Sequence, residues 1–233
     1  MTAEMDKRTA QVLESAVQEF IDTGEPISSG WLYNHYNFGI KPAMIRLELE
    51  KLSGGGFLEQ PHHSAGRIPT DKGYEFFAER VLESEKTQEP AHMFYRHIRN
   101  LFGRGEWLEL LNELSSNLGL LGVADDLRKK MVYKEGLENL IENFEWTTQE
   151  EIKSVIRDFA EIDNRLNQTL GELENENTPH IFIGRKSPVT KSESLAVVAG
   201  NYENAGSRVL LLAIGPKRMD YKKTLKVFKN LYQ

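Results

Sequence analysis

The sequence predicts an α+β protein with an N-terminal winged helix-turn-helix, a helical middle region and a small C-terminal α/β domain. Three helical segments before residue 56, then two short strand candidates and a fourth helix, have the order of elements typical of a winged helix. Helical spacing dominates residues 91–173, and three short apolar runs suited to strands follow. We expect two domains, residues 1–88 and 89–233.

The first two helices are predicted from apolar spacing and from capping residues. Residues 7–22 carry one stripe of apolar pairs four positions apart, and Gly24 ends this helix. Ser28 or Ser29 can cap a short second helix that runs to about Tyr36.

The third helix is predicted to begin at Pro42, which suits a first helical turn because its missing N–H is unpaired there anyway. Ile45, Leu49 and Leu52 form its buried stripe, and the glycines at 54–56 end it. The opposite face carries Ala43, Leu47 and Glu50, flanked by Met44, Arg46 and Lys51.

A two-stranded hairpin should follow, with strands over residues 57–60 and 67–69 and a turn over residues 61–66. Thr70 can cap the fourth helix. Residues 83–90 are expected to form a linker.

The middle of the chain, residues 91–173, is predicted to be helical. A capping box, Thr147 with Glu150 or Thr148 with Glu151, starts a long helix over residues 152–173. Its heptad-like spacing allows a coiled coil or a helix packed on its own domain, and we favour the second. An acidic loop over residues 171–178 should follow.

The C-terminal domain is predicted to contain three strands, over residues 180–184, 195–199 and 209–214. Residues 204–206 can turn the last two into a hairpin. Asp220 can cap a basic final helix that turns Leu225, Phe228 and Leu231 inward.

Composition excludes several classes of protein. The chain has no cysteine, which excludes disulfides, thiol nucleophiles and cysteine-ligated metals. No apolar run approaches the roughly 20 residues of a membrane helix, and residues 1–10 lack the apolar core of a signal peptide. We therefore expect a cytoplasmic protein without a membrane segment.

No constellation of residues predicts an enzyme. The six histidines lack the spacing of a metal site, and the glycines at 54–56 follow a helix rather than the strand that a phosphate-binding loop requires. Nucleophile-elbow and Walker sequences are absent from the sequence. We expect no catalytic site, no metal and no cofactor.

The negative net charge means that any nucleic-acid binding must depend on a local surface. The net charge is -6, and residues 1–90 hold nine basic and fifteen acidic residues. Any DNA contact must therefore rest on the third helix and on the exposed hairpin tip, where we expect Arg67. On the third helix, Arg46 can bridge guanine O6 and N7 or can instead pair with Glu50. The candidate DNA-binding residues are Ser28, Ser29, Lys41, Ala43, Met44, Arg46, Leu47, Lys51, His62, His63, Ser64, Ala65, Gly66, Arg67 and Thr70.

Several long motifs carry a resemblance to a known family. Residues 58–74, LEQPHHSAGRIPTDKGY, closely resemble the wing of the HrcA heat-inducible transcription repressors, with only His63 departing from the family motif PHTSAGRIPTDKGY. Residues 23–27, 36–40, 132–140 and 181–184 resemble further parts of that family. The C-terminal family motif is matched by Gly215, Pro216, Arg218, Met219, Asp220 and Tyr221.

The resemblance implies a repressor of chaperone operons that binds an inverted repeat as a dimer and is assisted by the GroE chaperonin. It also implies a GAF-like domain with an inserted dimerisation domain. The chain is shorter than the family's usual length, and between Leu121 and Val132 there is no room for the early GAF-like strands, so we expect a reduced GAF-like domain. In the third helix, Met44 and Leu47 replace the family's Thr and Asn.

Two other functions remain open from the sequence. The acidic N-terminal part and the altered third helix are compatible with a protein-interaction module that does not bind DNA. A small-molecule sensor built on residues 181–221 ranks last, because only three strands are expected to wall its pocket. For the dimer, we favour the C-terminal α/β segment over the helix at residues 152–173.

Overall fold

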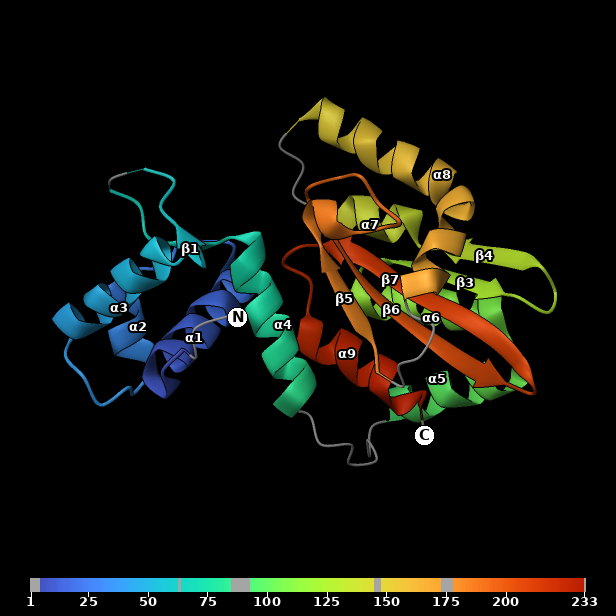
Figure 1. The fold of residues 1–233 in the computed structure, drawn as a ribbon, viewed down its shortest axis with the longest axis horizontal. Helices are drawn as coiled ribbons and strands as arrows, with labels where there is room; N and C mark the ends of the chain where they lie inside the picture. Colours follow the sequence, from blue (N-terminus) through green and yellow to red (C-terminus); the bar gives the residue numbers. More distant parts are fainter. Residues whose placement is uncertain (1–4, 63, 85–92, 145–147, 173–177, 233) are drawn as a thin grey trace. The chain divides into compact units, whose positions relative to one another are not determined.

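The computed structural model describes residues 5–62, 64–84, 93–144, 148–172 and 178–232. The chain divides into two compact units, Met1–Arg80 and Val81–Gln233 (Figure 1). Helices and strands occur in both units, which confirms the α+β class. The predicted boundary at residues 88/89 lies outside the described residues and stays a prediction.

The first unit begins with three helices whose ends follow from the sequence. Asp6 caps the first helix through its side chain, and Gly24 ends it in the left-handed conformation, with φ of 73°. The Ser28 hydroxyl accepts the amide of Trp31 at 3.1 Å and so caps the second helix. The helices are α1 (Lys7–Thr23), α2 (Ser29–His35) and α3 (Pro42–Gly54).

A short antiparallel hairpin and a fourth helix complete the first unit. Strand β1 (Leu58–Glu59) pairs with β2 (Ile68–Pro69), and α4 (Asp71–Ser84) follows. Thr70 caps α4, because its hydroxyl accepts a hydrogen bond from the amide of Gly73 at 3.3 Å. The predicted stripe of α3 is buried, which confirms the orientation of that helix.

The second unit is built on a five-stranded, fully antiparallel sheet with the strand order β4-β3-β7-β6-β5. The turn at residues 205–206 joins β6 and β7 as predicted. The elements are α5 (Met93–Arg104), α6 (Trp107–Leu118), β3 (Leu121–Asp126), β4 (Met131–Glu135), α7 (Leu137–Asn143), α8 (Gln149–Glu172), β5 (His180–Ile183), a 3-10 turn (Gly184–Lys186), β6 (Leu195–Asn204), β7 (Ser207–Pro216) and α9 (Tyr221–Asn230).

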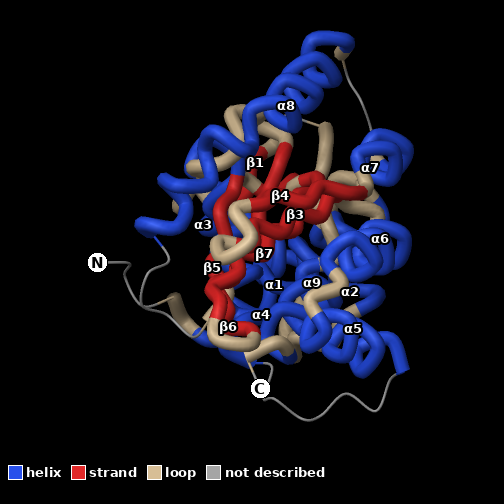
Figure 2. Tube along the Cα trace, turned by 90° about the vertical axis from the view of Figure 1, so that its right-hand side faces the viewer, coloured by secondary structure: helices blue, strands red, loops and turns tan. Residues whose placement is uncertain are grey.

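Helices cover both faces of this sheet, with α8 on one side and α5, α6 and α9 on the other (Figure 2). Val155, Ile162 and Leu166 of α8 join one core cluster with β3, β6 and β7. This burial confirms that the long helix packs on its own unit. Leu225, Phe228 and Leu231 are buried as predicted, and Asp220 caps α9.

Two predictions about the middle of the chain are wrong. Residues 121–126 and 131–135 form strands, although residues 91–173 were expected to be helical, so the sheet has five strands rather than three. All six residues of β3 are buried and it contains a single β-branched residue, so neither alternation nor composition marks it as a strand. Its partner β7 lies far along the sequence, and tertiary pairing therefore decides its conformation.

The observed boundaries of the long helix also differ from the predicted ones. Helix α8 begins at Gln149 and includes Gly171 and Glu172, where the predicted helix and the predicted acidic loop overlapped, and residues 173–177 lie outside the described residues. Of the two possible capping boxes, the one at Thr148 is present, because its hydroxyl accepts the amide of Glu151 at 3.2 Å. Thr147 lies outside the described residues.

A buried carboxylate attaches the loop between β5 and β6 to α8. Asp158 is 2% exposed and accepts hydrogen bonds from the backbone amides of Lys191 at 2.9 Å and Ser192 at 2.8 Å. Arg165 donates to the same carboxylate at 2.7 Å and to the carbonyl of Val189 at 2.9 Å. The Asp158 carboxylate therefore shares with Glu161 the neutralisation of Arg165 and satisfies two loop amides.

We expect Asp158→Ala to lower the free energy of unfolding by about 3 kcal/mol, because the largely buried guanidinium of Arg165 loses one of its two carboxylate partners and two amides lose their acceptor. Urea denaturation of the whole chain measures the change. Lys153→Ala on the same helix removes an exposed ion pair with Glu150 and should cost less than about 1 kcal/mol. Equal losses for the two variants would contradict this role of Asp158.

Candidate nucleic-acid interface

The start of α2, the exposed side of α3 and the hairpin converge on one hollow of about 400 Å³ in the first unit. Three separate segments of the chain therefore contribute to the same surface. Seven of the predicted DNA-binding residues line it, namely Ser28, Ser29, Arg46, Ser64, Ala65, Gly66 and Arg67. The same hollow is also lined by Ile27, Leu49, Glu50 and Gln60, which the sequence analysis did not select.

A backbone bridge holds the hairpin against the start of α2. The amide of Ile27 donates to the carbonyl of Arg67 at 2.8 Å, and the amide of Arg67 donates to the carbonyl of Ile27 at 2.8 Å. Gly66 packs so closely here that an added Cβ would lie 2.6 Å from the carbonyl carbon and oxygen of Ile27. A side chain at position 66 would therefore force the hairpin away from α2.

The described part of the hairpin turn is ordered by its own hydrogen bonds. The Ala65 amide donates to the carbonyl of His62 at 2.9 Å, and the Gln60 side chain donates to the carbonyl of Ala65 at 2.9 Å. His62 and Ser64 are exposed, as the sequence predicted. His63 lies outside the described residues.

The prediction that Arg67 lies at the exposed tip is wrong. Arg67 stands at the base of the hairpin, is half-buried, and donates from Nε to the hydroxyl of Ser53 at 2.9 Å. Its backbone pairs with Ile27, and this long-range bridge has no signal in the local sequence. Arg67 thus connects the hairpin to the end of α3 while still lining the hollow.

The outward face of α3 carries the candidate base-contacting side chains. Lys41, Ala43, Met44, Arg46 and Leu47 are all exposed, although only Arg46 among them lines the hollow. Arg46 Nε lies 3.2 Å from Glu50 Oε1, and the two side chains are 75% and 48% exposed. An ion pair so open to water contributes little stability, so Arg46 can exchange it for another acceptor at little cost.

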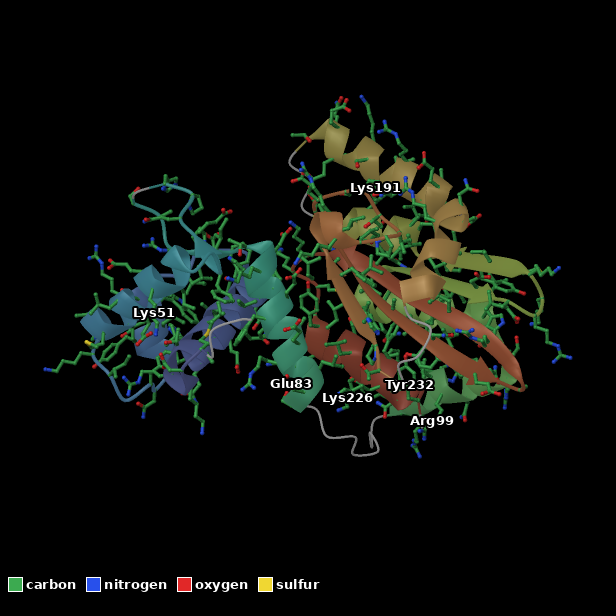
Figure 3. The ribbon with its side chains drawn as sticks, in the orientation of Figure 1. Lys51, Glu83, Arg99, Lys191, Lys226 and Tyr232 are labelled. Carbon is green, nitrogen blue, oxygen red and sulfur yellow. The ribbon has the colours of Figure 1, made fainter. Side chains whose placement is uncertain are left out.

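Lys51 is directed toward the start of α1 rather than into the hollow (Figure 3). Its ammonium lies 2.7 Å from Asp6 Oδ2 and 3.0 Å from the Thr9 hydroxyl. The hydrogen bond from Lys51, aided by those from Thr9, holds the pKa of Asp6 well below its usual range. The hydrogen bond to Asp6 in turn raises the pKa of Lys51, so the lysine stays charged.

Thr70 and the residues of the C-terminal motif make contacts within the fold of their own unit. The Thr70 hydroxyl donates to the carbonyl of Gly56 at 2.7 Å. In the second unit, Gly215 and Pro216 end β7, and Met219 is buried. The Asp220 side chain accepts the amide of Lys223 at 3.0 Å, and the Tyr221 hydroxyl donates to the carbonyl of Lys217 at 2.6 Å. Together with Arg218, this motif forms the connection from β7 into α9.

The described residues contain no group of three or more side chains suited to hold a metal ion. Among the same residues, no helix is long and apolar enough to cross a membrane.

Comparison with known proteins identifies the class and then the family. A crystal structure of a hypothetical protein shares the fold, with a TM-score of 0.79 over 98% of this chain and 97% of that chain at 20% identity. The fold therefore belongs to a class of α+β proteins already seen in a solved structure. Residues 75–225 match the family model of the HrcA protein C-terminal domain, and the chain belongs to the HrcA family.

Curated relatives are similar over a shorter stretch. A heat-inducible transcription repressor HrcA of Clostridium perfringens is 45% identical over 82 residues, which is 35% of this chain and 24% of that protein. The repressor of the same name from Moorella thermoacetica is 44% identical over 89 residues, which is 38% of this chain and 24% of that protein. The matched stretch thus spans about a quarter of the length of these relatives.

Gly66→Ala should destabilise the first unit by about 2 kcal/mol, because the new methyl group overlaps the backbone of Ile27. Gly54→Ala is the matched control, since it ends α3 with open space around its Cβ position and gains helix propensity. Chemical denaturation measures both changes. A Gly66→Ala variant as stable as the wild type would show that the hairpin does not depend on this close approach.

Asp6→Asn should reduce stability at neutral pH and much less in acid. The folded-state pKa of Asp6 lies below its unfolded value, so its ionised form stabilises the fold above about pH 4, and this contribution is lost as the pH falls further. We expect the difference between wild type and Asp6→Asn, measured by urea denaturation, to shrink from about pH 7 to about pH 3. In a Lys51→Met background the pH dependence of that difference should be much smaller. A difference that grows in acid would contradict the assignment.

Proposed function

We propose that this chain is a DNA-binding transcriptional repressor of heat-shock genes, with the first unit acting as a winged helix-turn-helix. The observation that carries the proposal is the convergence of α2, α3 and the hairpin on one hollow. A recognition helix flanked by a hairpin is an arrangement that can place one element in a groove and the other on the backbone. Membership in the HrcA family supports the same function.

In this proposal α3 enters the major groove and the hairpin contacts the sugar-phosphate backbone. Arg46 is exposed and can donate to guanine O6 and N7 after leaving Glu50. The exposed Ser64 can bind phosphate oxygens without added charge. Lys41 stands exposed at the start of α3 with no capping bond from its side chain, and can reach a phosphate.

We further propose that the repressor binds an inverted repeat as a dimer. The first unit is acidic overall, so a single copy has too little electrostatic attraction to DNA for tight binding. Two copies on a two-fold symmetric site would each contribute contacts to the same duplex. The second unit, as the GAF-like domain of the resemblance, offers the sheet edges β4 and β5 for pairing. The same proposal includes assistance by the GroE chaperonin and a cytoplasmic location.

A protein-interaction function is the second candidate, and one observation favours it. Glu50 lines the hollow, where a carboxylate would repel nearby phosphates. Fluorescence anisotropy of the full chain with duplexes that carry or lack a chaperone-operon inverted repeat separates the two functions. Preferential binding to the inverted repeat supports the repressor, and equally weak binding to both duplexes supports the interaction module.

Arg46→Ala should weaken binding to the inverted repeat by about 1–3 kcal/mol and weaken binding to a scrambled duplex less, because a base contact is lost. Arg185→Ala provides a matched control, since Arg185 is 77% exposed and pairs with Glu193 in the second unit. Titrations at one fixed salt concentration measure both variants. Equal losses on the two duplexes would exclude Arg46 from base recognition.

A further inference from the structure

The exposed face of α3 carries an apolar patch. Residues three and four positions apart are neighbours on a helix surface, so Ala43, Met44 and Leu47 form one continuous patch. Met44 is 44% exposed and Leu47 is 55% exposed, and both are among the most exposed large apolar residues in the described part of the chain. The patch is a feature of this face alone, since Ile45, Leu49 and Leu52 are buried on the opposite side.

Charged side chains flank this patch. Arg46 and Glu50 lie on the hairpin side, where they pair with each other and line the hollow. Lys51 lies on the α1 side, where Asp6 holds it. Helix α3 therefore offers one exposed cationic donor, Arg46, beside a patch of three exposed apolar side chains.

We infer that Ala43, Met44 and Leu47 recognise the C5-methyl groups of thymine in the major groove, so that this protein prefers A·T pairs beneath this apolar patch of α3. The inference rests on the proposed function, because it assigns a specificity to the same DNA-binding surface. Thymine is the only base that presents a methyl group in the major groove, and apolar side chains contact it there. The exposed Arg46 and Lys41 favour a polyanionic duplex as the occupant of this face.

The test uses the full chain and begins with selection of a preferred duplex from a random library. Each thymine of that duplex is then replaced by deoxyuridine, which removes only the methyl group. We expect at least one position per half-site at which binding weakens about fourfold, the effect of one buried methyl group. In the variants Leu47→Ala and Met44→Ala, the loss at these positions should decrease or disappear.

Leu108→Ala is the matched control, because Leu108 is a leucine of the second unit that is 53% exposed, close to the value for Leu47. This variant should keep the full sensitivity to deoxyuridine. Circular dichroism confirms that each variant is folded.

The outcomes separate the inference from the proposed function. Failure of the wild type to select any sequence would contradict sequence-specific DNA binding itself. Sequence-specific binding without any loss on methyl removal would overturn only the inference. An undiminished loss in both Leu47→Ala and Met44→Ala would assign the methyl contact to another element and also overturn it. A loss of self-association in these variants, with unchanged DNA binding, would show that the patch covers a second copy of the chain.

Discussion

The candidate site depends on one constraint, the pairing of the hairpin base with the residue before α2. The two hydrogen bonds between Ile27 and Arg67 join segments forty residues apart, and the bare backbone of Gly66 permits their close approach. Arg67 extends this connection to α3 through Ser53. The pairing therefore fixes the hairpin beside α2, where the two elements and α3 line one hollow.

Electrostatics limits how this surface can bind. The N-terminal part is acidic, and Lys51, one of its few cations near α3, is bound to Asp6. The exposed Arg46 is already paired with Glu50. A partner must therefore be recognised through shape, apolar contact and exchangeable pairs rather than through a strong positive field, which is the arrangement expected when specificity outweighs general affinity.

Local signals in the sequence predicted most of the first unit, because capping residues and apolar stripes determine helices over short distances. Ser28 and Thr70 were each followed by a helix at the expected place. The position of Arg67 and the strand β3 could not be predicted in this way, since each depends on a partner distant in the sequence.

Hydrogen–deuterium exchange of the full chain, with and without a duplex carrying the inverted repeat, tests the central claim most directly. Binding through the first unit predicts slower exchange of backbone amides in α3 and around Ser64 and Ala65, with little change in β6 and β7. Protection confined to the second unit, or no protection at a duplex concentration that saturates binding, would contradict the account.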